Sequence, residues 1–295
     1  MIRQSFFYKP LILLACCSLA TIGCKQNSPK VKITTESENG SQLIKINKVT
    51  FSVPSPLQVA MLLKKTNTNY NKALLNSADN VSRYSTNYSK ALNLGIYTAD
   101  IGYTVTYDQT QDAILYLHSA QELASSLSIV GSFEKEMMDR FQKNITSQDS
   151  IFAIVTGAFN SSDNYLKRNN RKDIATLTVA GGWIEALHFL ANVSKSSNNQ
   201  EIVNRIGEQK VTLNNLIKLL MEFQEQKEIG ALIDQLLELS NLYENVKITY
   251  SYKEPSIDIA NKITTINSET IVIITKKQLT EITKQIDKIR EQIVK

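Results

Sequence analysis

Residues 178–188 read TVAGGWIEALH and place two adjacent glycines, Gly181 and Gly182, beside Trp183, the only tryptophan of the chain. The surrounding sequence has helical periodicity and predicts a helix over residues 171–195. A glycine inside a helix costs about 1 kcal/mol relative to alanine. We therefore expect these glycines to mark a place where a second backbone comes close, at the short end of the usual ~8–10 Å range of helix spacings.

A second predicted helix, residues 82–107, carries a matching stripe of small residues. The two stripes are Ala175, Thr178, Gly182 and Ala186 on one helix, and Gly95, Ala99, Gly102 and Thr106 on the other. Steps of three and four residues place each set on one helix face. We expect the two small faces to cross in contact. The alternative is that the glycines admit a ligand next to the backbone.

The rest of the sequence favours a mainly α fold, a multi-helix bundle built from antiparallel helical hairpins. Only five prolines and ten glycines interrupt the chain. The predicted helices cover residues 82–107, 109–129, 132–143, 147–169, 171–195, 199–225 and 228–243, and short segments bring the total to about 7–9 helices. Before them, VTFSVPSP (49–56) predicts a short strand that stops at Pro54, and Ser55 and Pro56 suit the start of a helix. We assign residues 43–245 to this helical domain.

Near the C-terminus, the spacing of apolar residues changes from a helical period to the alternation typical of a strand. NVKITYSYKEP (245–255) alternates apolar and polar residues, which predicts a half-exposed strand, and ETIVIIT (269–275) is a second strand that would pair with it as an antiparallel hairpin. A terminal helix follows from about residue 276. Its apolar seam consists of Leu279, Ile282, Ile286, Ile289 and Ile293. We expect residues 246–295 to pack on the helical domain; the alternative is that the seam binds a helix of a partner protein in the envelope.

The N-terminus resembles a bacterial lipoprotein signal. Arg3 and Lys9 precede an apolar run that ends in TIGCK, residues 21–25. The run is too short for a permanent membrane helix. The resemblance implies a signal peptide over residues 1–23, a lipidated Cys24 and a polar, flexible tether over residues 24–42. Two alternatives are cleavage before Cys16 and an uncleaved anchor helix.

Composition excludes several classes of chemistry. The three cysteines, Cys16, Cys17 and Cys24, all lie in the first 24 residues, so the mature domain has no internal disulfide, thiolate metal site or cysteine nucleophile. Removal of residues 1–23 takes two cations from a net charge of +5 and leaves +3. This mild charge gives no support for nucleic-acid binding, which needs a concentrated basic patch.

The sequence contains few groups with catalytic potential. Asp100 and Glu185 lie on the two small-residue helices, flanked by Tyr97, Tyr103 and Trp183. These five residues form our candidate pocket, and the alternative is a pair of carboxylates satisfied structurally by tyrosine hydroxyls. Sequence alone does not show whether the two acids meet.

Metal and hydrolase motifs are weak or missing. Glu185 and His188 form E-x-x-H, a spacing used in di-iron bundles, but those bundles need the motif on two helices and the other histidine, His118, lacks it. The sequence has no G-x-S-x-G, no phosphate-binding glycine loop and no calcium loop. We expect neither a metal nor a cofactor.

Three blocks together resemble a family of uncharacterised helical lipoproteins of Bacteroidota-type bacteria. They are VPSPLQVAMLLKK (53–65), KALNLGIYTADIGYT (90–104) and YLKRNNRKDIATLTVAGGWIEALH (165–188). The resemblance implies a helical protein held on the envelope, and it implies no activity.

Two functions are compatible with these features. The first is a non-enzymatic binding or scaffolding module tethered to the lipid bilayer through Cys24, with the periplasmic side of the outer membrane as its expected place. The second is a ligand-binding protein or carboxylate-dependent enzyme with a pocket near Asp100, Glu185 and Trp183. A pocket with unpaired acids of shifted pKa would favour the second function.

Overall fold

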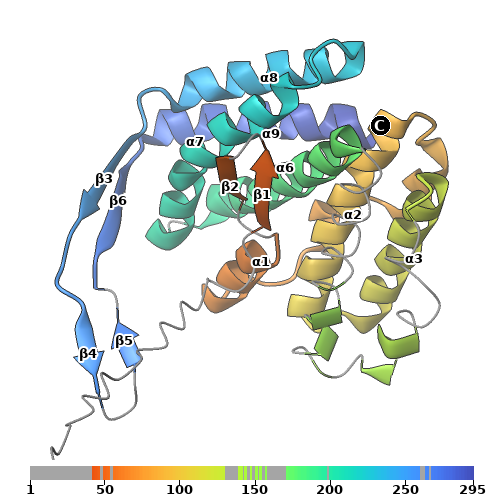
Figure 1. Ribbon diagram of the computed structural model, residues 1–295. Helices are drawn as coiled ribbons and strands as arrows, with labels where there is room; N and C mark the ends of the chain where they lie inside the picture. Colours follow the sequence, from red (N-terminus) through yellow and green to blue (C-terminus); the bar gives the residue numbers. More distant parts are fainter. Residues whose placement is uncertain are drawn as a thin grey trace, which may run out of the picture. The chain divides into compact units, whose positions relative to one another are not determined.

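The computed structural model describes residues 42–46, 49–53, 56–129, 171–197, 199–259, 263–265 and 267–295, with scattered positions between 139 and 157. All described residues belong to one compact unit, Ser37–Lys295, whose elements are labelled in Figure 1. The predicted signal peptide, Cys24 and the tether up to residue 41 lie outside the described residues, as do most of the predicted helices 132–143 and 147–169.

The unit Ser37–Lys295 is mainly α, as the sequence predicts. Its helices are α1 (Pro56–Lys65), α2 (Asn87–Thr106), α3 (Thr110–Ser126), α6 (Lys172–Ser196), α7 (Gln200–Met221), α8 (Lys227–Tyr243) and α9 (Lys276–Val294), with 3-10 helices η1 (Lys72–Leu74) and η2 (Ala78–Arg83). The helix predicted from residue 82 begins at Asn87, because Thr86 and Ser89 form a capping box that satisfies the first backbone N–H groups.

Helices α2 and α6 form the centre of the bundle. They make the most extensive contact of any two helices described. Helices α1 and α3 pack on α2, and α7 and α9 pack on α6. Helix α8 packs against both α7 and α9 (Figure 1). Among the described helices, α6 alone is long and apolar enough to span a membrane, but 94% of that apolar window is buried inside the protein. We therefore interpret α6 as the core helix of the bundle.

The glycines bring the backbones of α2 and α6 into direct contact. A Cβ added to Gly95 would overlap the carbonyl oxygen of Thr178 and lie 2.6 Å from the amide nitrogen of Gly182. A Cβ added to Gly181 would overlap the carbonyl oxygen of Leu92. Only glycine leaves room for another backbone at these positions.

Gly102 has a different environment from the one expected for its stripe. An added Cβ there would meet Leu57 of α1 at 3.6 Å, an ordinary contact, and not α6. The close approach of α2 and α6 is therefore confined to the part of α2 around Leu92 and Gly95, and α1 covers the next turns.

A short hairpin precedes the helices. Strand β2 (Val49–Val53), which the sequence predicts, pairs antiparallel with β1 (Gln42–Ile46). The partner strand was not predicted, and its first residue falls in the stretch assigned to the tether.

The C-terminal hairpin is longer and more exposed than expected. Strand β3 (Lys247–Ser251) pairs antiparallel with β6 (Glu269–Ile273), and beyond them β4 (Ser256–Asp258) pairs with β5 (Ile263–Thr265). We call residues 247–273 the ribbon. The prediction of a half-exposed strand was wrong for β3, whose first four residues are all exposed. Among the described elements, only β6 makes extensive contact with it.

The base of the ribbon is fixed to α7. Val272 is buried against Gly207, where an added Cβ would overlap its Cγ1 atom. The ammonium group of Lys210 donates hydrogen bonds to the carbonyl oxygens of Glu244 (2.8 Å) and Val246 (3.0 Å). These contacts hold the start of β3 and the end of β6.

The terminal helix α9 is part of the core. Ile282, Ile286 and Ile289 are fully buried, Ile293 is 8% exposed and Leu279 is partly buried. Their helix packs against α6 and α8. The apolar seam is therefore occupied within the same domain and does not form a free surface for a partner helix.

Candidate functional site

The structure brings the two predicted acids together at the centre of the bundle. Asp100 comes from α2 and Glu185 from α6, and both side chains are fully buried. The two carboxyl groups are close enough for Glu185 to raise the pKa of Asp100. The contact between the two helices, made possible by their glycines, explains why residues 85 positions apart in the sequence meet.

Arg290 of α9 completes the site. Its Nε donates to Oε2 of Glu185 and its Nη2 donates to Oε1, each at 2.7 Å, and Nη2 also donates to the carbonyl oxygen of Leu74 at 3.0 Å. This bidentate geometry is the strongest form of arginine–carboxylate contact. Sequence reasoning missed Arg290, although its position next to the apolar seam of α9 indicates a charged residue at the edge of a buried face. We call Asp100, Glu185 and Arg290 the buried triad.

The environment favours a protonated Asp100. Burial and the neighbouring Glu185 raise the pKa of Asp100 well above its usual range, although Arg290 acts in the opposite direction. Its Oδ2 accepts a hydrogen bond from the amide nitrogen of Asn76 at 3.3 Å, and its Oδ1 is buried without a hydrogen bond. With Asp100 protonated, the triad holds one negative and one positive charge, so its net charge is zero.

Neutral polar groups extend the triad to the end of the chain. The amide of Asn76 donates to the hydroxyl of Tyr84 at 2.9 Å and to Asn93 at 3.2 Å. Asn93 donates to the carbonyl oxygen of Ile293 at 2.9 Å, and Tyr84 donates to that of Val294 at 3.3 Å. The last carbonyls of a helix have no partner within the helix. This network satisfies two of them and fastens the C-terminal end of α9 to α2.

The other candidate pocket residues have partners of their own. The indole Nε1 of Trp183 donates a hydrogen bond to Gln209 of α7 at 2.9 Å. This group therefore links α6 to α7 and does not donate to Asp100 or Glu185. The hydroxyl of Tyr97 donates to the carbonyl oxygen of Ser77 at 2.8 Å. The ring of Tyr103 stacks on Tyr70 and packs against Phe189, and its hydroxyl accepts a hydrogen bond from the backbone of Asn71 at 3.1 Å.

The E-x-x-H pair also faces α9. While Glu185 binds Arg290, Nδ1 of His188 lies 2.8 Å from Oδ1 of Asp287. Residues one turn apart on α6 thus meet residues one turn apart on the antiparallel α9. Burial alone would raise the pKa of Asp287, but hydrogen bonds from His188, Lys195 and Asn192 outweigh it and lower the pKa to about 2. In the described part of the chain, no three metal-binding side chains cluster.

The contacts of the buried triad are those of a structural link between helices. Neither carboxylate is exposed to solvent, and Glu185 already has a cation on both of its oxygens. A catalytic or ligand-binding acid needs a free atom that a substrate can reach. In this conformation the triad instead joins α2, α6 and α9.

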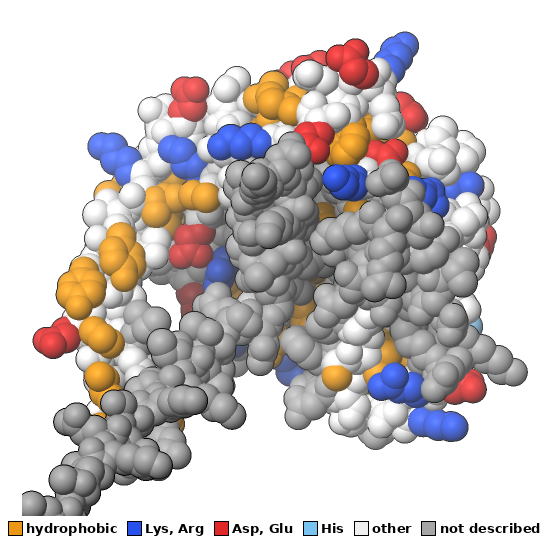
Figure 2. All heavy atoms as spheres, viewed as in Figure 1, with side chains coloured by type: hydrophobic (Ala, Val, Ile, Leu, Met, Phe, Trp, Pro, Cys, Tyr) orange, Lys and Arg blue, Asp and Glu red, His pale blue; other side chains and the backbone are white. Residues whose placement is uncertain are grey.

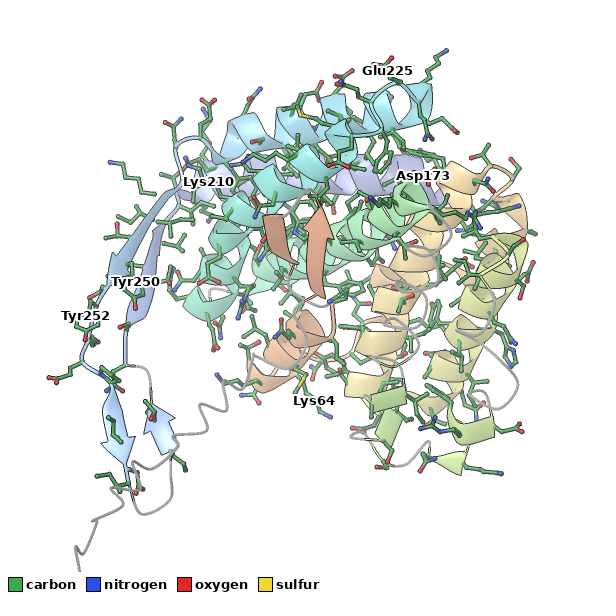
Figure 3. All side chains as sticks on the ribbon, in the orientation of Figure 1. Lys64, Asp173, Lys210, Glu225, Tyr250 and Tyr252 are labelled. Carbon is green, nitrogen blue, oxygen red and sulfur yellow. The ribbon has the colours of Figure 1, made fainter. Side chains whose placement is uncertain are left out.

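The ribbon is the second candidate site, because it is rich in exposed apolar side chains. Eight of the thirteen large apolar side chains that are exposed in the described residues lie on it (Figure 2). They are Ile248, Tyr250, Tyr252, Ile257, Ile259, Ile263, Ile271 and Ile273. Tyr250 lies on β3 and is 64% exposed, and Tyr252 follows the strand and is 72% exposed (Figure 3). Sequence periodicity found the strand but not its exposure.

The sequence of the ribbon has a net charge of zero. Its charged residues are three lysines (Lys247, Lys253 and Lys262) and three acids (Glu254, Asp258 and Glu269). A zero net charge offers no long-range attraction to a polyanion or a polycation. Any recognition by this surface would therefore rely on apolar contact and backbone hydrogen bonds.

Comparisons with protein-family models, with characterised proteins and with solved structures give no significant match.

Proposed function

We propose that this protein is a lipid-anchored protein of the bacterial envelope that acts by binding other molecules and not by catalysis. One observation carries the proposal: a concentration of exposed isoleucine and tyrosine side chains on a ribbon that the helical core leaves uncovered. Contiguous exposed apolar surface on a soluble domain is typical of an interaction site.

The anchor is supported by the N-terminal sequence. A short apolar run ends in Gly23 and Cys24, and the next residues, KQNSPK, are polar. Each buried methylene contributes about 0.8 kcal/mol to membrane attachment, and two or more acyl chains give a stable anchor. An anchored protein needs no high solution affinity for partners on the same membrane, because anchoring raises their effective concentration.

The alternative, a pocket with catalytic carboxylates, has less support. Its one favourable observation is the unpaired Oδ1 of Asp100. Against it, Glu185 is neutralised by Arg290, and Trp183 points to α7. Both observations favour a structural role for the acids.

The binding proposal is tested by affinity capture from detergent-solubilised envelope with the full chain. The test variant replaces Tyr250, Tyr252 and Ile257 on the ribbon by serine. The matched control replaces three exposed apolar residues on the helices, Met61, Leu115 and Val211, whose exposed fractions are 54%, 45% and 59%. We expect the ribbon variant to lose the captured proteins and the control variant to keep them. Equal capture by both variants would contradict the proposal.

The anchor is tested separately by labelling cells with an alkyne fatty acid. We expect the wild type to incorporate the label and to sediment with membranes, and the Cys24→Ser variant to do neither. A Cys16→Ser variant distinguishes the two cysteines: if only this variant loses the label, cleavage occurs at the earlier site.

A further inference from the structure

One edge of the ribbon is open. Strand β3 pairs with β6 on one side, and no described strand lies on its other side. Strand β6 is the one in contact with α7, so the open edge of β3 faces away from that contact (Figure 1). An unpaired strand edge presents a row of backbone donors and acceptors to another strand.

The side chains of β3 suit the addition of a strand. Ile248 and Tyr250 point to one face, and Lys247, Thr249 and Ser251 point to the other. Aromatic and β-branched residues stabilise sheets through cross-strand pairs. The strand carries no proline, and its one charge, Lys247, is its first residue, so the four residues from Ile248 to Ser251 carry no charge or proline that would protect the edge.

We propose that the open edge of β3 binds the β3 strand of a second copy of the protein, antiparallel and centred on Thr249. The two ribbons then form a four-stranded sheet in the order β6–β3–β3–β6. This inference rests on the proposed function as a binding protein and names its partner.

The pairs formed in this register are the reason for choosing a second copy. About a two-fold axis at Thr249, Thr249 faces Thr249, Ile248 faces Tyr250 and Lys247 faces Ser251. All five residues of β3 are then paired, and no like charges meet. Threonine–threonine and aromatic–β-branched pairs each contribute about 0.2–1 kcal/mol relative to alanine pairs.

Neighbouring registers are less favourable. An axis at Tyr250 would place Lys247 opposite Lys253, and like charges directly opposite destabilise a sheet. An axis at Ile248 would place Tyr250 opposite Val246, which is buried at the base of the ribbon. The zero net charge of the ribbon allows two copies to approach without mutual repulsion.

Single-cysteine cross-linking provides a sharp test, because the unit Ser37–Lys295 contains no cysteine and includes every described core residue. In this unit, Thr249→Cys places two thiols opposite each other across the axis. Ser251→Cys is the matched control: its two copies are displaced by four residues, about 13 Å, whereas a disulfide needs Cα atoms closer than about 7 Å. Circular dichroism and the thermal midpoint verify that each variant is folded.

We expect the Thr249→Cys protein to form a disulfide-linked dimer under mild oxidation at least about tenfold faster than Ser251→Cys, as the geometric limit implies. Sedimentation of the unmodified unit should show concentration-dependent dimers. Thr249→Lys should abolish them by placing two cations on the axis, and Thr249→Val should retain them.

Two results would overturn the inference: equal cross-linking at both positions, or a unit that stays monomeric and does not cross-link. Neither result affects lipidation, since residue 24 is absent from the unit, and neither affects capture of a different protein by the ribbon. Failure of this inference and failure of the proposed function are therefore distinguishable.

Discussion

The helical core and the ribbon use the same residue type in opposite ways. In α9, Ile282, Ile286 and Ile289 are fully buried, whereas on the ribbon Ile257 is 67% exposed and Ile259 is 85% exposed. Full burial of an isoleucine contributes about 1.5–3 kcal/mol to folding. The ribbon isoleucines contribute little of this, so their presence is better explained by contact with another molecule than by the fold.

The core also buries charged side chains, which normally lie on the surface. Glu185 and Asp100 are fully buried in the core, where charges are costly. The core compensates with Arg290, and burial raises the pKa of Asp100, which favours its neutral form. We therefore expect folding to depend on particular buried contacts in the core and to depend little on the side chains of the ribbon. Four measurements test this difference, from the largest expected effect on stability to the smallest.

The largest effect is expected from breaking the buried triad. Glu185→Gln removes the carboxylate that neutralises Arg290 and leaves a cation of low exposure unpaired, which costs about 3–5 kcal/mol. Chemical denaturation followed by circular dichroism measures this loss.

Asp100→Asn is the matched control for the triad. Because the pKa of Asp100 is raised in the folded state, its ionisation lowers stability as the pH rises above the pKa of the unfolded chain. Asparagine is neutral at every pH and can still donate to Glu185. We expect a change of less than about 1 kcal/mol, or a gain, at pH 7. Equal losses in both variants would show that Asp100 is ionised.

The next effect concerns the contact between α2 and α6. Gly95→Ala forces a methyl group against the carbonyl oxygen of Thr178, and overpacking of this kind costs about 2–3 kcal/mol. Gly102→Ala, on the same helix, meets only Leu57 at 3.6 Å and should stabilise the protein by up to about 1 kcal/mol. Thermal unfolding of the two variants gives opposite shifts, and a stabilised Gly95→Ala protein would show that the helices do not touch there.

A smaller effect is expected from Asp287 and depends on pH. Its pKa of about 2 lies below the unfolded value of about 3.9, so its contribution is present above pH 4 and is lost as the pH falls towards 2. With allowance for solvent screening, the contribution is about 1–2 kcal/mol. The difference in unfolding free energy between wild type and Asp287→Asn should therefore be largest above pH 4, fall steeply between pH 4 and pH 2, and level off only below pH 2. A difference that is independent of pH would contradict this origin.

The smallest effect is expected on the ribbon. Serine at Tyr252 and Ile259, which are 72% and 85% exposed, should change the free energy of unfolding by no more than about 0.5 kcal/mol. A loss above about 1 kcal/mol in a dilute sample would mean that the ribbon is covered within the same chain. In that case the comparison between core and ribbon fails.

Much of the fold follows from local pattern. The helical spacing of the segment around Trp183 and the alternation from Val246 to Tyr252 predict α6 and the β3–β6 hairpin because both depend on neighbours in the sequence. The β4–β5 pair was missed, since three-residue strands are too short to show a period.

The site was predictable only in part, because its contacts are distant in the sequence. The small-residue stripes suggested that Asp100 and Glu185 lie on touching helices. Arg290 meets Glu185 across 105 positions, and no local pattern identifies such a partner. The exposure of the ribbon was missed for a related reason: alternation gives the two faces of a strand but does not say whether anything covers them.

The position of Arg290 on α9, the last helix described, has a consequence for biosynthesis. A ribosome delivers α2 and α6 before α9, so the carboxylate of Glu185 has no counter-ion until Arg290 has been synthesised. The nascent core therefore stays short of its native state until α9 has emerged, and a product terminated before Arg290 remains open to proteolysis.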